Sequence, residues 1–182
     1  MKNFFFARRT PASQVPPTQA RALAPQKPAP EETARPTLDQ RFLRLLSLYR
    51  GTGGMARFDE VAHVFNRRHA PGMDALTRWI ASRHVIGFEW RGELWLPLFQ
   101  FTGCDLMPSS TLQPVLAELN PLLDPLSLAE WFARPHALLG NNSPVQVMLG
   151  NPCSVLAAAR VDKTMAQLRH RRDVEPIRLT RH

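Results

Sequence analysis

Residues 128–152 read LAEWFARPHALLGNNSPVQVMLGNP and decide how the distal half of the chain folds. Ser143-Pro144 and Asn151-Pro152 each place a capping residue directly before a proline, and Asp124-Pro125 does the same just upstream. A capping side chain satisfies free backbone N–H groups, and proline suits the first helical turn, so each pair predicts a helix start. Three such starts in close succession predict short helices that meet at sharp angles.

The distal half predicted from these signals is all-helical and close to neutral. The expected helices cover residues 114–119, 125–134, 144–149 and 152–169. Between residues 105 and 160 two arginines face four acidic residues, whereas the flanking parts of the chain are basic. A polyanion would therefore meet the N-terminal part and the C-terminal tail rather than this half. Short helices around Trp131-Phe132, without a catalytic constellation, indicate a compact helical docking module.

Upstream, three helices are predicted. Thr37 and Gln40 have the spacing of a capping box, and apolar residues at helical spacing follow them as far as Tyr49. Gly51 lies where a left-handed C-terminal residue is expected. Thr52-Gly-Gly-Met is interpreted as a turn. The second and third helices are expected at about residues 57–69 and 73–83.

The hydrophobic pattern then changes from helical to alternating. Residues 84–90 and 93–97 lie on either side of an Arg91-Gly92 break, which predicts a β-hairpin. Pro97 closes the second strand, as proline does at a strand end. Three helices followed by a hairpin have the element order of a winged helix-turn-helix, so residues 37–101 are predicted to be winged-helix-like. After residue 101 only helices are expected.

The predicted class is therefore mainly α, with tails at both ends. Residues 1–36 hold seven of the seventeen prolines and few aromatic side chains after Phe6, which predicts a disordered basic tail. The expected divisions are this tail, the winged-helix-like domain at 37–101, the helical domain at 105–170 and a basic tail at 171–182.

A cytoplasmic location and no membrane association are expected. No apolar run approaches the roughly 18 residues that a membrane-spanning helix needs. The apolar run after Met1 is too short for a secretory signal. Cys104 and Cys153 are isolated from each other, which fits a reducing compartment.

Neither an enzyme nor a metal or cofactor site is predicted. The six histidines are scattered without a pair four residues apart, and no nucleophile elbow is present. Glu130 beside Trp131 has two interpretations, an acid with a raised pKa in an apolar pocket and an ordinary residue on a solvated helix face. The solvated face is the favoured interpretation.

Nucleic-acid binding receives more support than catalysis. Arginines at the ends of the expected helices and at the hairpin tip are candidates for a rim that contacts phosphates. Asp59, Glu60 and Asp74 dilute their field, so ordinary surface charge remains the alternative. The candidate DNA-binding residues are Arg67, Arg68, Arg78, Arg83 and Arg91.

Residues 84–162 resemble the C-terminal toxin-binding domain of Xre/MbcA/ParS-type antitoxins. That family shows a Trp-hydrophobic helix, a Pro-x-x-x-Leu-x-Gly stretch and a helix that starts with a small residue and proline. The matching residues here are Trp131-Phe132, Pro135, Leu138 or Leu139, Gly140, Ser143-Pro144, Leu149-Gly150 and Val155, with residues 95–101 resembling the Pro-x-Phe-Gln-Phe stretch that often precedes the domain. Two features depart from the family. The glycine that frequently ends the family's last helix is replaced around Val161-Asp162. The N-terminal half is predicted to contain helices and a hairpin, whereas the Xre DNA-binding domain is all-helical.

The resemblance implies a small helical domain that binds and blocks a toxin, often a RES-domain enzyme that degrades NAD, in an operon autoregulated through DNA. A docking face of large apolar residues would supply the buried anchors that interfaces need. Trp131 is expected to lie in the core, and its exposed polar neighbours are expected to contact the partner. The candidate toxin-binding residues are Leu128, Trp131, Arg134, His136, Leu139, Asn141 and Met148.

The prediction is thus a homodimeric antitoxin-like protein whose partners are a cognate toxin and operator DNA. The first alternative is a stand-alone DNA-binding transcriptional regulator whose C-terminal half serves dimerisation. A phage or plasmid accessory protein that uses the same helical module is a third interpretation.

Overall fold

The computed structural model describes residues 36–67, 72–102 and 106–174. Within these ranges the chain forms seven α-helices and a three-stranded antiparallel sheet, so the predicted mainly helical class is confirmed. The expected tail at 1–36 lies outside the described residues except for Pro36, as do Arg68, Cys104 and residues 175–182.

The three predicted helix starts in the distal half are confirmed. Helices α5 (Pro125–Ala133), α6 (Pro144–Met148) and α7 (Pro152–Val174) begin at their prolines. Asp124 Oδ1 accepts a hydrogen bond from the Ser127 N–H at 2.9 Å, and Asn151 Oδ1 accepts one from the Ser154 N–H at 3.1 Å. Helix α4 (Gln113–Leu119) also lies where it was expected.

Helix α7 runs five residues beyond its predicted end at Arg169. The helix thereby includes Arg171 and Arg172, which the sequence pattern assigned to a tail. Apolar periodicity fades there, but arginine has good helix propensity, and positive charge suits the C-terminal end of a helix. The basic end of the chain therefore begins as a helix.

Helix α1 (Leu38–Tyr49) starts with the predicted capping box, in which Gln40 N–H donates to Thr37 Oγ1 and Thr37 N–H donates to Gln40 Oε1. Its end differs from the prediction. The chain continues as a 3₁₀ turn (Arg50–Thr52), so Gly53, with a φ of 96°, is the left-handed residue instead of Gly51.

A three-stranded sheet follows where only a hairpin was predicted. Strands β2 (Phe88–Trp90) and β3 (Glu93–Pro97) form the expected hairpin, with positive φ at both Arg91 and Gly92, as a type I′ turn requires. Strand β1 (Met55–Arg57), predicted as turn and helix start, pairs with β3 and places the strands in the order β1-β3-β2. Three residues are too few to show strand alternation.

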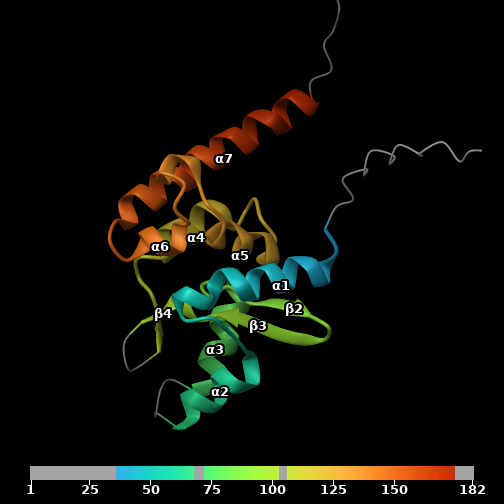
Figure 1. The fold of residues 1–182 in the computed structure, drawn as a ribbon, viewed down its shortest axis with the longest axis vertical. Helices are drawn as coiled ribbons and strands as arrows, with labels where there is room; N and C mark the ends of the chain where they lie inside the picture. Colours follow the sequence, from blue (N-terminus) through green and yellow to red (C-terminus); the bar gives the residue numbers. More distant parts are fainter. Residues whose placement is uncertain (1–35, 68–71, 103–105, 175–182) are drawn as a thin grey trace, which may run out of the picture. The chain divides into compact units, whose positions relative to one another are not determined.

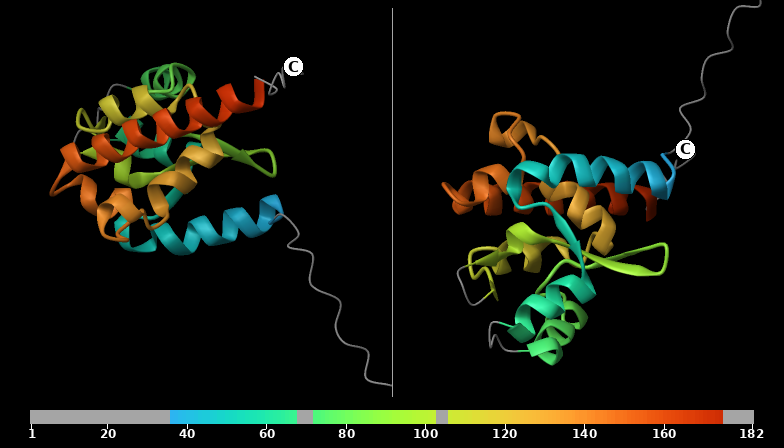
Figure 2. Two further views of the ribbon diagram at one scale, coloured as in Figure 1. Left: turned by 90° about the horizontal axis from the view of Figure 1, so that it is seen from above. Right: turned by 60° about the horizontal axis from the view of Figure 1, so that its bottom comes forward.

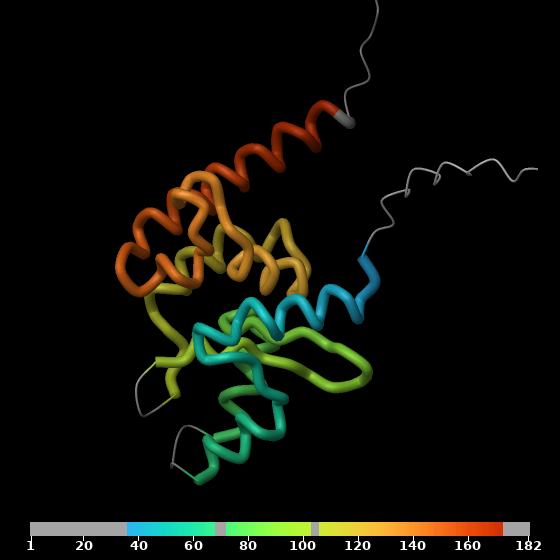
Figure 3. The backbone as a smooth tube through the Cα atoms, viewed as in Figure 1, coloured from blue at the N-terminus to red at the C-terminus, as the bar shows by residue number. Residues whose placement is uncertain are grey.

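Helices α2 (Phe58–Arg67) and α3 (Gly72–Ala81) lie between β1 and β2 in the chain. A second small sheet, β4 (Phe101–Thr102) with β5 (Met107–Pro108), corrects the expectation that only helices follow residue 101. Figure 3 lets the reader follow this path from α1 through α2 and α3 to the hairpin, and then into the helices of the distal half.

Two hydrophobic clusters hold these elements together. In one, α2 and α3 pack against one another and the sheet, through Phe65, Leu76 and Leu96. In the other, α1 and β2 pack with α4, α5, α6 and α7. Helix α1 therefore lies between the hairpin and α5, with α2 and α3 across the sheet (Figure 1). The division expected between residues 101 and 105 does not separate these cores, since α1 contributes to the cluster of the distal helices. Figure 2 shows the ribbon of α1 alongside these helices.

Two side chains hold the segment before β2 in place: Gln100 joins it to the residues after β3, and Arg83 joins it to the distal half. The fully buried Gln100 side chain accepts from the Ile86 N–H at 2.7 Å and donates to the Ile86 carbonyl at 2.9 Å. Arg83 donates to the carbonyls of Asn120 and Leu123, at 2.9 and 2.6 Å. Both side chains supply hydrogen-bond partners to backbone groups that the neighbouring helices and strands leave unpaired.

Replacing Gln100 with leucine is expected to lower the free energy of unfolding by about 2 kcal/mol, because the Ile86 N–H and carbonyl would stay buried without partners. Gln113 is the matched control, since its amide also donates to a backbone carbonyl, that of His84, but in an exposed position. Gln113→Leu should change the stability by less than about 0.5 kcal/mol. Urea unfolding of both variants measures the difference, and equal losses would contradict the role of burial.

Candidate partner-binding site

Three of the predicted toxin-binding residues converge where α5 ends. Pro135 stops the helix, and the chain turns back through His136, whose backbone N–H donates to the Asn142 carbonyl at 3.0 Å. Trp131 on the last turn of α5, Arg134 directly after it and His136 in the turn line a single hollow of about 340 Å³. These local stop signals therefore place an aromatic, a cationic and an imidazole side chain together.

Asp162 of α7 holds two of these side chains in place. Its Oδ2 accepts from the Trp131 indole N–H at 2.7 Å and lies 3.1 Å from His136 Nε2. The Leu138 backbone N–H donates to His136 Nδ1, so Nε2 is the ring nitrogen that directs its proton to Asp162. The rings of Trp131 and His136 meet edge to face at 5.8 Å between centroids. Both rings are thus oriented by the same carboxylate.

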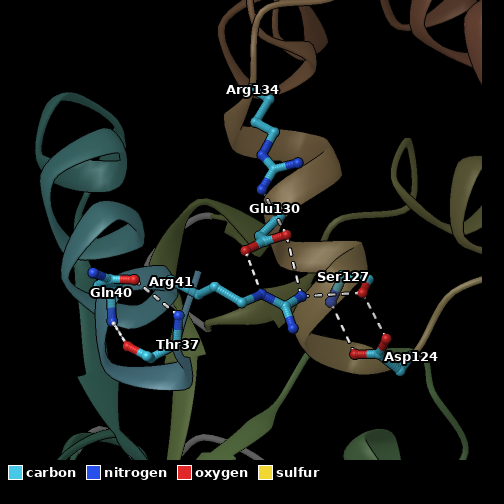
Figure 4. Close-up of polar contacts among 7 residues, drawn as sticks. All are labelled: Thr37, Gln40, Arg41, Asp124, Ser127, Glu130 and Arg134. Atoms are coloured by element: carbon cyan, nitrogen blue, oxygen red, sulfur yellow. Dashed lines mark hydrogen bonds and ion pairs between the residues drawn. The ribbon is translucent and has the colours of Figure 1, made fainter. Parts of the chain in front are cut away.

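A second carboxylate, that of Glu130, lies between Arg41 and Arg134 (Figure 4). Glu130 is buried, and Arg41 of α1 grips both of its oxygens at 2.7 and 3.2 Å. Arg134 donates to Glu130 Oε2 at 2.9 Å, so one carboxylate serves two guanidinium groups. The expectation that Glu130 lies on a solvated helix face is wrong, because α1 covers that face of α5 and supplies the counter-charge.

The hydrogen bond to Glu130 raises the pKa of the Arg41 guanidinium above its ordinary value. Arg41 also donates to the Ser127 hydroxyl at 3.2 Å. Burial acts to raise the pKa of Asp124, but two hydrogen bonds from Ser127 outweigh burial and lower that pKa. Along this side of α5 two guanidinium groups, those of Arg41 and Arg134, thus accompany two carboxylates, those of Glu130 and Asp124.

A further hollow, of about 290 Å³, lies on the other side of Trp131. It is formed by the end of α4, the residues after it and α7, and shares Leu123 and Trp131 with the first hollow. Trp131 is half-buried and packs edge to face on Phe132 of the core at 5.0 Å between centroids. The tryptophan predicted to lie in the core is thus a wall between two open hollows.

Of the remaining predicted toxin-binding residues, three are buried and one is exposed. Leu128, Leu139 and Met148 are buried in the core of this chain, with exposed fractions of 2, 7 and 5%. They pack within the chain's own core and present little surface to a partner. Asn141 is exposed and has a left-handed backbone, with a φ of 62°. The residues placed for direct contact are therefore Trp131, Arg134, His136 and Asn141.

The candidate DNA-binding arginines do not form one rim. Arg83 is engaged by backbone carbonyls, and Arg91 binds Asp39 at 2.7 Å and stacks over the Trp90 ring. Both hydrogen bonds that Asp39 accepts, from Arg91 and Trp90, lower its pKa. Arg67 on α2 and Arg78 on α3 are exposed, whereas Arg68 lies outside the described residues.

A larger hollow, of about 580 Å³, lies elsewhere. Its wall is formed by Gly51–Gly53, Leu98, Phe99, Phe101, Thr102, Ser109, Thr111, Leu112, Val145, Gln146, Met148 and Leu149. Of the candidate toxin-binding residues, Met148 alone is among its described lining residues. The volume of a hollow therefore does not identify the face around Trp131 as the candidate site. That face is identified by the convergence of the candidate residues.

The sequence pattern did not predict that Asp162 and Arg41 belong to the site. Arg41 is 89 positions from Glu130, and Asp162 is 31 positions from Trp131. Such contacts depend on how helices dock, so no local spacing signals them. A salt-bridge partner for Glu130 was, however, required in principle once that residue was buried.

Comparisons with known proteins add no relative. No family model matches the chain, and neither a curated protein nor a solved structure is similar to it. None of the described helices has the length and apolar character to cross a bilayer. In the described ranges no three His, Cys, Asp or Glu side chains gather as metal ligands do.

Arg41→Ala is expected to lower the free energy of unfolding by about 1–2 kcal/mol, because the buried Glu130 carboxylate loses its two-point partner. Arg134→Ala removes the other partner of Glu130 from an exposed position and should cost less than about 0.5 kcal/mol. Chemical denaturation of the two variants at neutral pH checks the order. A larger loss for Arg134→Ala would contradict the assignment of Arg41 as the supporting residue.

Proposed function

We propose that this chain is an antitoxin-like protein that binds and inhibits a partner toxin through the face around Trp131. The observation that carries the proposal is the convergence of Trp131, Arg134 and His136 around one hollow that opens to solvent. Tryptophan and arginine are the residues that most often dominate the energy of protein interfaces. Inhibition by covering a partner's active site requires no catalysis from this chain.

The fixed geometry of the face supports the same proposal. Asp162 restrains the Trp131 and His136 rings before any partner arrives, and Glu130 restrains Arg134. Side chains that are already ordered lose less conformational entropy on binding, so more of the contact energy appears as affinity. The resemblance to Xre/MbcA/ParS-type antitoxins makes a RES-domain enzyme that degrades NAD the first candidate partner.

Co-expression tests the proposal. The full-length chain should restore growth of cells that express the candidate toxin encoded beside its gene. Arg134→Glu should abolish the rescue, because it reverses the charge at the centre of the proposed contact. Arg44→Glu, an exposed change on α1, should leave the rescue intact. Full rescue by Arg134→Glu, or the lack of a toxin gene in the neighbourhood, would contradict the proposal.

We propose in addition that residues 37–101 act as a winged-helix-like module that binds operator DNA. The chain order α1-β1-α2-α3-β2-β3 and the sheet order β1-β3-β2 support it, with α3 as the helix that would enter the major groove. Arg78 on α3 and Arg67 on α2 are exposed. Helix-turn-helix proteins commonly bind paired half-sites, so the proposed form is a homodimer in the cytoplasm.

The second candidate function is a stand-alone transcriptional regulator, in which the distal helices serve only dimerisation. The same element and sheet order favours it. Both candidate functions require DNA binding for regulation. Only the antitoxin-like protein also requires a toxin, so rescue of growth in the co-expression test distinguishes the two.

Arg78→Ala is expected to weaken binding to a fragment of the protein's own promoter about three- to tenfold and to reduce the slope of log K against log salt by about one. Arg44→Ala is the control, because α1 lies across the sheet from α3 (Figure 1). Fluorescence anisotropy at several salt concentrations measures both quantities. Equal effects of the two substitutions would count against α3 as the DNA-reading helix.

A further inference from the structure

The hollows beside Trp131 continue along α7 into a third. A hollow of about 530 Å³ lies between the Pro121-Leu122 turn and the distal half of α7. It shares Leu122 and Ala166 with the 290 Å³ hollow, which in turn shares Leu123 and Trp131 with the 340 Å³ hollow. The three form one open groove, called here the α7 groove, that runs from Arg134 to Arg171.

The floor of the α7 groove is mainly apolar in its middle hollow of about 290 Å³ and mixed in the hollows at its two ends. Leu119, Leu122 and Leu123 form one side, and Trp131, Met165 and Ala166 form the other. Met165 is 48% exposed, although a methionine on a helix surface gains by being covered. The floor therefore favours a ligand that brings its own apolar side chains.

The two ends of the α7 groove are positive. Arg134 stands at one end, where Arg41 already neutralises Glu130 from beneath. Arg169 and Arg171 stand at the other end, and both are exposed. Asp162, between the ends, has its Oδ2 engaged by Trp131 and His136. Positive charge is thus greatest at the end with Arg169 and Arg171, the ion-paired Arg134 stands at the other end, and the Asp162 carboxylate lies between them.

The part of the groove between Asp162, which contacts Trp131, and Arg169 spans about two turns of α7, since these two residues are seven positions apart. Seven residues of helix rise about 10 Å. A binding segment with an acidic residue at each end of an apolar stretch of that length would complement the groove throughout. An acidic helix has this pattern when its apolar residues recur at helical spacing.

We infer that the α7 groove receives an amphipathic acidic segment of the partner protein. This inference rests on the proposed function and deepens it, because it states the chemistry by which the partner is recognised. The partner's apolar residues cover Leu122, Met165 and Ala166, and its carboxylates pair with Arg134 and with Arg169 or Arg171. Such charge pairs add orientation and a faster association rate that falls with salt.

Two fluorescent probe peptides test the inference on the full-length chain. One is an amphipathic helix of roughly 16 residues, with leucines at helical spacing and glutamates on its flanks. Its counterpart has lysine in place of every glutamate. The acidic peptide should bind at least about tenfold more tightly than the basic one, and the difference should shrink as salt rises.

Substitutions locate the binding in the groove. Ala166→Trp, which fills two of the hollows, and Arg169→Glu with Arg171→Glu should each weaken the acidic peptide at least about tenfold. Ala157→Trp, an exposed change on the same helix outside the groove, and Arg44→Glu should stay within about twofold. Circular dichroism establishes that each variant keeps its helices.

Several outcomes would overturn the inference: equal affinity for the two peptides, no binding of either, or an equal loss with Ala157→Trp. Sedimentation that shows a dimer converted to a monomer by Ala166→Trp would assign the groove to a second copy instead. If Ala166→Trp loses the peptide but still neutralises the toxin, the groove is not the toxin site and the proposed function stands. If the peptide binds as expected but no toxin is neutralised, the proposed function fails and the groove assignment stands.

Discussion

Helix α1 packs against the hairpin on one side and against α5 on the other, and both halves of the described chain depend on that position. Phe42 stacks on Trp90 of the hairpin at 3.8 Å between ring centroids. Tyr49, fully buried, donates its hydroxyl proton to the Ala129 carbonyl at 2.7 Å, and burial raises its pKa well above the ordinary value. Arg41 adds the ion pair to Glu130. Because one helix makes all three contacts, the sheet and the distal helices share a core.

The face proposed for partner binding is a consequence of that core. Glu130 lies on the buried side of α5, and its carboxylate orients Arg134 only because Arg41 balances its charge from α1. On the other side of the site, α7 supplies Asp162, which orients Trp131 and His136. Buried or half-buried ion pairs and hydrogen bonds therefore fix the orientation of the surface side chains. These side chains need little reorganisation when a ligand binds.

The apolar residues expected to anchor a partner show why composition does not identify an interface. Leu128, Leu139 and Met148 have the residue types of interface anchors, but they are also the residue types of a core. The chain between residues 113 and 159 is short, and its small helices must bury most of their apolar side chains against each other. What is left for a partner is the edge of the core, where Trp131, Leu122 and Met165 stay partly exposed.

Cap residues and prolines determined where α1, α5, α6 and α7 begin, because a cap is satisfied by backbone groups within three residues. The type I′ turn at Arg91-Gly92 was likewise local. Strands β1, β4 and β5 were decided by tertiary pairing, since two or three residues carry no periodicity of their own. Tertiary structure also decided that Arg83 and Arg91 are occupied, that Glu130 is buried and that α7 flanks a groove. All of these features depend on how the helices pack against one another. The contacts that determine this packing join residues far apart in the chain.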